Sequence, residues 1–132
     1  MRSPRAVASK LVEIAREARL RAYAPYSRFL VGAALLGADG RIFTGCNVEN
    51  GSYGATICAE RTALVKAVSE GCREFAALAL VTSERPPVTP CGVCRQVLAE
   101  FAPALRLLLA STRGPHETVS LARLLPRAFR LR

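Results

Sequence analysis

Apolar residues near the start of the chain recur at intervals of three and four positions. Between residues 4 and 22 charged residues occupy the opposite side of this pattern, which predicts an amphipathic helix. A turn sequence at 37–40 predicts that residues 41–46 return as the second strand of a hairpin. Three apolar runs lack the helical period and favour buried strands: residues 29–36, 75–82 and 105–110.

The helical spacing returns in later stretches. Residues 57–70 and about 92–101 each carry an apolar stripe, and a short helix is predicted over 120–125, before Pro126. The predicted order is helix, hairpin, helix, strand, helix, strand. Because helices that connect strands of one sheet pack on its faces, this order predicts an α/β fold with a mixed sheet flanked by helices.

Length and composition fit a compact protein with its own core. The chain has 132 residues, 51% of them hydrophobic, so we expect residues 1–132 to form a single domain without disulfide bonds. No apolar run approaches the ~20 residues that a transmembrane helix needs, and the first residues lack a signal-peptide core. We therefore expect a cytoplasmic protein with reduced cysteines and no membrane partner.

The charge balance is strongly basic. Nineteen Lys and Arg residues against ten Asp and Glu residues give a formal net charge of +9. Such a charge permits binding to nucleic acid or to acidic ligands, but the arginines are scattered along the chain rather than gathered in one block. We do not expect nucleic acid as a partner, and charge alone does not decide the function.

Candidate chemistry gathers in two short stretches. Cys58 stands at the predicted start of a helix, and Glu60, two residues later, falls on the apolar stripe of that helix. A carboxylate at such a position is costly unless it is paired, protonated or catalytic. The second stretch holds Cys91 and Cys94, whose spacing points both sulfurs the same way at the start of another helix.

Three cysteines and one carboxylate suit an open zinc site. A structural zinc takes four protein ligands, whereas a catalytic zinc keeps one position for water. The Cys-x-x-Cys pair alone is not specific, because redox sites and structural zinc sites use it too. Three thiolates give the zinc core a net negative charge. Arg61 and Arg95, each beside a ligand, are predicted to donate hydrogen bonds to the sulfurs.

Motifs along nearly the whole chain carry a family resemblance. They are Ala24-Pro25-Tyr26-Ser27-x-Phe29-x-Val31-Gly32-Ala33-Ala34, Gly45-Cys46-Asn47-Val48-Glu49-Asn50, Cys58-Ala59-Glu60-Arg61-Thr62-Ala63-Leu64, Cys91-Gly92-x-Cys94-Arg95-Gln96 and Leu124-Leu125-Pro126-x-Ala128-Phe129. In this order they resemble the zinc-dependent nucleoside and nucleobase deaminases, in particular the small homotetrameric cytidine deaminases with three cysteine ligands. The resemblance implies a three-layer α-β-α sandwich with a mixed sheet of about five strands.

The resemblance also implies a reaction, the hydrolytic deamination of cytidine and 2′-deoxycytidine to the uridines, with release of ammonia, in pyrimidine salvage. Cys58, Cys91 and Cys94 would hold one Zn²⁺ per chain. A zinc-held hydroxide would attack C4 of the base, and Glu60 would shuttle the protons. Independently of the family, a buried carboxylate beside a metal-bound water can move protons near neutral pH.

Substrate contacts follow from the same resemblance. Asn47 and Glu49 would hold the ribose hydroxyls, and alternate residues of an extended segment do project to one side. Both residue types also suit turns, so a structural role stays open. Phe29 would pack against the base or belong to the core. The other implied contacts are Val48, Ala59, Tyr53 and Phe129.

A homotetramer is expected on the same grounds. Tyr53 and Phe129 match positions that complete a neighbouring subunit's site in the tetrameric members of the family. Phe129 lies in a short tail after Pro126, where a monomer has no core for it.

Other functions share parts of this pattern. An aminonucleoside-antibiotic deaminase shares the size and the zinc signature, but Phe29, Asn47 and Glu49 together argue against it. A polynucleotide deaminase needs a groove and contacts to flanking bases, for which 132 residues leave little room. A structural-zinc or nucleic-acid-binding module would explain the paired cysteines and the charge. It would not explain Glu60 on an apolar stripe.

Overall fold

A five-stranded sheet forms the centre of the computed structural model, which describes residues 3–131. Its strand order is β2-β1-β3-β4-β5, and β3 and β4 are parallel while the other neighbouring pairs are antiparallel. The sheet is therefore mixed. The strands are β1 (Gly32–Gly37), β2 (Ile42–Cys46), β3 (Phe75–Thr82), β4 (Arg106–Ser111) and β5 (Glu117–Ser120).

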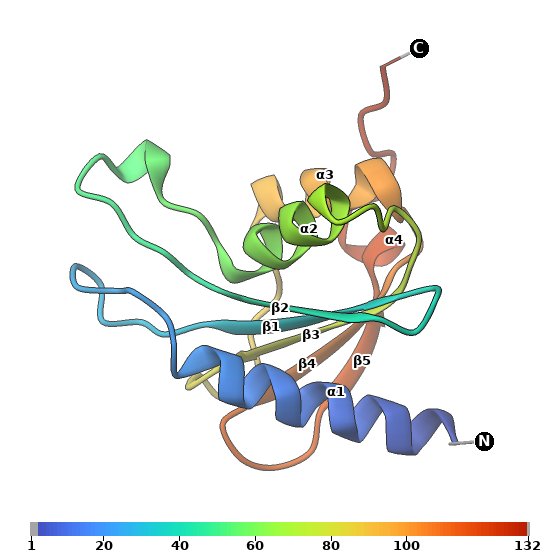
Figure 1. Ribbon diagram of the computed structural model, residues 1–132, viewed down its shortest axis with the longest axis horizontal. Helices are drawn as coiled ribbons and strands as arrows, with labels where there is room; N and C mark the ends of the chain where they lie inside the picture. The colour runs from blue at the N-terminus through green and yellow to red at the C-terminus, as the bar shows by residue number, and fades with distance from the viewer. Residues whose placement is uncertain (1–2, 132) are drawn as a thin grey trace.

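Helices cover both faces of this sheet. Helix α1 (Pro4–Arg19) crosses one face, while α2 (Ala59–Ser69) and α3 (Gly92–Phe101) lie on the other (Figure 1). The short helix α4 (Leu121–Leu124) contacts α3 and β5, and a 3₁₀ turn, η1 (Tyr53–Ala55), precedes α2. Two clusters of buried apolar residues fill the two interfaces. The predicted three-layer α-β-α sandwich with about five strands is confirmed.

Two strand glycines let helices lie close to the sheet. A Cβ atom on Gly32 of β1 would stand 2.1 Å from the carbonyl oxygen of Ala15 in α1. A Cβ atom on Gly45 of β2 would stand 2.3 Å from the carbonyl oxygen of Ala59, in the first turn of α2. Since real Cβ contacts are never so short, only glycine admits these helices. The second contact matters for function because it places the start of α2 against the sheet.

The strand over Phe75–Thr82 and the helix over Gly92–Phe101 lie where the sequence predicts them. The first predicted strand, residues 29–36, begins only at Gly32. The N–H of Val31 and the carbonyl oxygen of Phe29 bond the side chain of Asn47 rather than the backbone of a neighbouring strand. Local polar bonds therefore shorten the strand that the apolar run predicts.

The second predicted helix begins at Ala59, not at residue 57. Cys58 is the N-cap, with extended backbone angles (φ −73°, ψ 155°), and Ile57 forms an isolated bridge with Val48. Ile57 consequently does not share the helix stripe. The helix predicted over 120–125 is shorter in the structure. Strand β5 ends at Ser120, and α4 spans only Leu121–Leu124. Strand β5, with a polar sequence at the sheet edge, carries too little apolar pattern to be predicted.

Within residues 3–131 no helix is long and apolar enough to cross a membrane.

Candidate active site

Three cysteine sulfurs meet at the starts of two helices. Cys58 precedes the first residue of α2, Cys91 precedes that of α3, and Cys94 lies in the first turn of α3. Their Sγ atoms all lie within 4.8 Å of one another, and Cys91 and Cys94 are 3.5 Å apart. A tetrahedral zinc with Zn–S bonds of about 2.3 Å needs sulfurs roughly 4 Å apart. The donor set therefore fits one zinc ion per chain.

The electrostatics of these thiols favour a bound cation. A hydrogen bond from Cys94 lowers the pKa of the Cys58 thiol to about 5, and a smaller contribution comes from Arg61. The same shared bond raises the pKa of Cys94 above the ordinary thiol value. Without a cation, then, the cluster holds its protons unequally, because adjacent thiolates repel each other. A divalent metal removes that repulsion, and both helix N-termini also favour thiolates.

Glu60 lies in the first turn of α2, beside the cysteine cluster. Only 4% of its surface is exposed, and this burial raises the pKa of its carboxyl to about 7. Leu64 and Ala67 on the same helix are also buried, so the carboxylate does share an apolar stripe. A carboxyl group with a pKa close to neutral can both accept and release a proton under ordinary conditions.

One cavity of about 340 Å³ joins the cysteines to most of the predicted substrate residues. Cys58, Cys91 and Glu60 lie along it, and so do the predicted contacts Phe29, Asn47, Glu49 and Ala59. The remaining lining comes from residues for which no role was predicted: Ser27, Val31, Thr56, Leu80, Thr82, Val88 and Thr89. Its volume falls within the range of small-molecule sites.

Asn47 connects the cavity to the backbone before β1. Its Nδ2 donates to the carbonyl oxygen of Phe29 at 2.7 Å, and its Oδ1 accepts the N–H of Val31 at 2.9 Å. Only 8% of Asn47 is exposed. An amide has two donor hydrogens and two acceptor lone pairs, so each end keeps one unused site for a ligand. The structural role and a substrate role are therefore compatible in Asn47.

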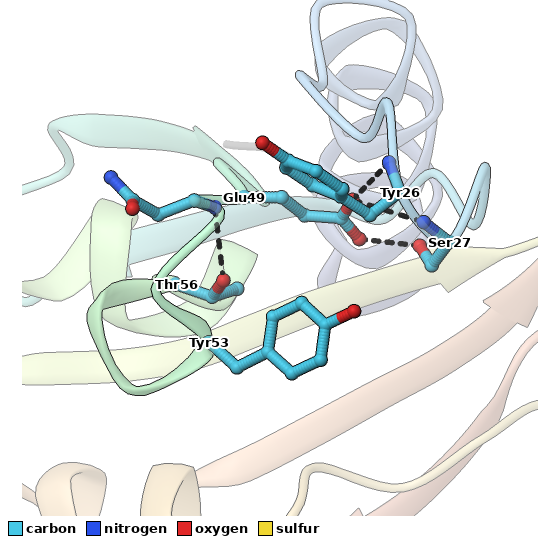
Figure 2. A pocket seen from close by; sticks show the side chains of 6 residues that line it. Tyr26, Ser27, Glu49, Tyr53 and Thr56 are labelled. Carbon is cyan, nitrogen blue, oxygen red and sulfur yellow. Dashed lines mark hydrogen bonds between the residues drawn. The ribbon is translucent and has the colours of Figure 1, made fainter.

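Glu49, which lines the cavity, holds the turn at residues 24–28. Its Oε1 accepts the N–H groups of Tyr26 and Ser27 at 3.0 and 3.1 Å, and its Oε2 accepts the hydroxyl of Ser27 (Figure 2). Glu49 and Ser27 also line a second hollow of about 350 Å³, together with Tyr26, Asn50, Tyr53 and Thr56. The two hollows thus adjoin at Ser27, Glu49 and Thr56.

Three predicted substrate contacts do not line the main cavity of the same chain. Val48 is 42% exposed and lies on the strand-like bridge to Ile57. Tyr53 is 78% exposed in η1, where its ring meets that of Tyr26 edge to face at 6.3 Å. Phe129 is 70% exposed, and its carbonyl oxygen accepts a hydrogen bond from Gln96 of α3 at 3.0 Å.

The two arginines beside the ligands have different roles. Arg61 Nη2 lies 3.6 Å from Cys58 Sγ and 3.3 Å from the carbonyl oxygen of Thr56. Arg95 instead donates to oxygens of Pro90, Leu124 and Thr89 at 2.7–2.9 Å. The predicted bond from Arg95 to a sulfur is thus corrected, since its donors are engaged elsewhere. Arg95 ties down the segment before Cys91 and the end of α4.

Comparison with known proteins agrees with this site geometry. The family model for the cytidine and deoxycytidylate deaminase zinc-binding region matches residues 5–109. The chain belongs to this family. A cytidine deaminase of Sporosarcina psychrophila is 53% identical over 121 residues, which are 91% of this chain and 89% of the relative. One from Mycobacterium tuberculosis is 48% identical over 117 residues, covering 89% and 85%.

A solved structure of this family has the same architecture. The crystal structure of cytidine deaminase from Burkholderia pseudomallei superposes with a TM-score of 0.89 at 52% identity, covering 92% of this chain and 98% of that one. Membership in a zinc-binding deaminase family agrees with the three-cysteine cluster. It also makes the zinc an expected constituent of this deaminase-family protein.

Sequence reasoning missed the polar residues of the cavity wall. Ser27 and Thr56 carry no apolar or metal-ligand pattern, and Thr82 appears in the sequence only as the end of a buried strand. The sequence signal for Ser27 was its place between Tyr26 and Phe29 in the family-like motif that begins at Ala24. Which bond its hydroxyl makes depends on Glu49, 22 positions away.

Proposed function

We propose that this protein is a cytidine deaminase that hydrolyses cytidine and 2′-deoxycytidine to uridine and 2′-deoxyuridine, with release of ammonia. The observation that carries the proposal is that two cysteines of the three-cysteine cluster, Cys58 and Cys91, line one cavity together with the buried Glu60. Asn47 and Glu49 lie along the same cavity and keep unused hydrogen-bonding capacity. Relatives about half identical over most of their length are named cytidine deaminases.

The zinc ion, held by Cys58, Cys91 and Cys94, would supply the Lewis acidity that turns water into a nucleophile near neutral pH. Glu60 has the position and the pKa to accept the proton of that water. The carboxyl would pass on both protons of that water in turn, the first to N3 of the base and the second to the departing amine. The water oxygen would bond C4 and remain there as the carbonyl oxygen of the uridine, while the C4–N bond breaks and ammonia leaves. Arg61 offsets the negative charge on the Cys58 sulfur.

Polar residues of the same cavity suit the sugar. Asn47 and Glu49 would bind ribose hydroxyls, while Phe29 packs against the base and the backbone of Ala59 bonds its polar edge. Val48, which lies between the two proposed sugar contacts on the same segment, is a further proposed contact; its own N–H and carbonyl oxygen bond Ile57. These assignments are proposals, supported by the position of Phe29, Asn47, Glu49 and Ala59 along the cavity that Glu60 shares.

A single assay tests the activity. Purified protein is incubated separately with cytidine, 2′-deoxycytidine, cytosine and a single-stranded oligonucleotide, and the loss of cytosine absorbance is followed. Turnover of the two nucleosides with one zinc per chain is expected. Turnover of the oligonucleotide alone would instead assign the basic surface to nucleic acid, and no turnover of any would reject a deaminase of cytosine compounds.

We also propose a homotetramer in which Tyr53 and Phe129 complete neighbouring sites. Both aromatic rings are largely exposed and outside the main cavity of their own chain. Gln96 bonds the backbone of Phe129, and the exposed ring is available to pack against a partner chain. The whole chain, residues 1–132, would act as one domain. All five cysteines are free thiols, which suits a cytoplasmic location.

If each active site contains residues of two chains, two different inactive variants should restore activity to each other in a mixed assembly. Co-expressed Glu60→Gln and Phe129→Ala chains should form mixed assemblies more active than either variant alone. In these, a site with an intact Glu60 from one chain can receive an intact Phe129 from another. The measurement is specific activity of the purified mixture against each homomeric variant, with assembly size checked by light scattering. Activity that equals the average of the two variants would mean that each chain builds its own site.

A further inference from the structure

The turn at residues 24–28 is built around the carboxylate of Glu49. Figure 2 shows Tyr26 and Ser27 converging on it. The turn ends at Arg28, which has φ 59° and donates its N–H to the carbonyl oxygen of Ala24 at 2.9 Å. A residue other than glycine keeps such a conformation only where its surroundings determine it. Within this turn, Ser27 is held against Glu49 by both its N–H and its hydroxyl.

Counting donors and acceptors shows what Glu49 has left for a ligand. A carboxylate offers about four acceptor sites, two on each oxygen. The N–H groups of Tyr26 and Ser27 occupy both sites of Oε1, and the Ser27 hydroxyl occupies one site of Oε2. One site on Oε2 remains, which is room for a single hydroxyl. Because a carboxylate only accepts, the Ser27 hydrogen must point toward Glu49.

Glu49 lies where two hollows meet. Ser27 and Glu49 line both the cavity that contains Glu60 and the hollow that contains Tyr53. The Ser27 hydroxyl is also the main reason that the pKa of Glu49 lies below its ordinary value, with further contributions from the turn N–H groups. Glu49 thus presents a charged acceptor, and charged acceptors bind hydroxyl groups more strongly than neutral ones.

We propose that Ser27 is a positioning residue that orients Oε2 of Glu49 toward the 2′- or the 3′-hydroxyl of the substrate's sugar. Ser27 thereby sets the preference of the enzyme for nucleosides that carry sugar hydroxyls. This inference rests on the proposed function, since it takes a cytosine nucleoside as the substrate. It assigns the hydroxyl of Ser27 no contact with the base and no part in proton transfer.

Ser27 also contacts Phe29, the residue proposed to pack against the base, but this contact is the less important one. Its Oγ accepts the N–H of Phe29 at 3.0 Å, but the backbone of Phe29 is held a second time by Asn47. Removing the hydroxyl therefore releases Glu49 more than it releases Phe29. The loss of activity on removing the hydroxyl should therefore depend on whether the substrate carries the sugar hydroxyl that Glu49 binds.

The test compares Ser27→Ala, Ser27→Thr and the matched control Ser9→Ala, which changes an exposed serine of α1. Each zinc-loaded protein is assayed with cytidine and with 2′,3′-dideoxycytidine, which lacks the 2′- and 3′-hydroxyls and keeps the 5′-hydroxyl. For cytidine, Ser27→Ala should lower kcat/KM on the order of tenfold, mainly through KM, because a charge-assisted bond is lost. Ser27→Thr keeps the hydroxyl and should stay within about threefold of the unchanged protein. With dideoxycytidine the Ser27→Ala change should cost less than about twofold.

A double variant isolates the route through Glu49. In a Glu49→Gln background, Ser27→Ala should cause no further loss with cytidine, since the group that it positions is already altered. Equal losses on both substrates, or additive losses in the double variant, would overturn the proposal. Failure of the unchanged protein to deaminate cytidine is a separate result, because it rejects the proposed function before any variant is compared.

Discussion

Glu60→Gln should retain one zinc per chain and lose nearly all turnover. Gln keeps the size of the side chain but cannot accept a proton, and positioned acid–base groups typically contribute 10²–10⁴-fold, so a decrease in kcat of about 10³-fold is expected. The cysteine cluster is untouched, and the substitution places no charge in the buried position. Steady-state kinetics with cytidine and metal analysis of the same preparation measure both parts of this expectation.

The control for this variant is Glu70→Gln, at the exposed end of the same helix. It changes the same residue type without touching the cavity, so its activity should match that of the unchanged protein. If Glu60→Gln retained more than about a tenth of kcat with full zinc, proton transfer by Glu60 would be excluded. Loss of zinc together with activity would show that Glu60 serves the metal site rather than the chemistry.

Cys91→Ser should abolish zinc binding and, with it, activity. A serine hydroxyl does not ionise near neutral pH as a thiol does, so the cluster is reduced to Cys58 and Cys94. Cys91 is exposed, so the substitution itself leaves no cavity in the core. Zinc content should fall from about one per chain to near zero, and deaminase activity should fall with it.

Thermal unfolding gives this prediction a readout that does not depend on activity. A ligand that binds only the folded state stabilises it, by about 4 kcal/mol at a thousandfold excess over its Kd. A chelator should consequently lower the Tm of the unchanged protein and leave that of Cys91→Ser unmoved. Cys72→Ser is the matched control, because Cys72 is buried beside Glu74 and lies outside the cluster. A Cys91→Ser protein that kept its zinc and its chelator response would remove Cys91 from the ligand set.

Local patterns were sufficient to predict the elements that bury a continuous apolar stripe or run. The run at 75–82 and the helix at 92–101 are confirmed because nothing polar in the tertiary structure competes with them. The start of β1 is different. The apolar run before Gly32 bonds the side chain of Asn47, a residue 16–18 positions away, and no local period records such a bond. The polar edge strand β5 has no local signal for the same reason, since only its neighbour β4 makes it a strand.

The sequence by itself determined the chemistry of the site. Three cysteines and a carboxylate on a helix stripe predict an open zinc centre from residue type and spacing, because those properties are local. Only the tertiary structure decided which residues share the cavity. The close approach of α2 to Gly45 brings Glu60 to the sheet, and the turn at 24–28 brings Ser27 to Glu49. Such contacts join residues distant in the chain, so packing rather than sequence pattern specifies them.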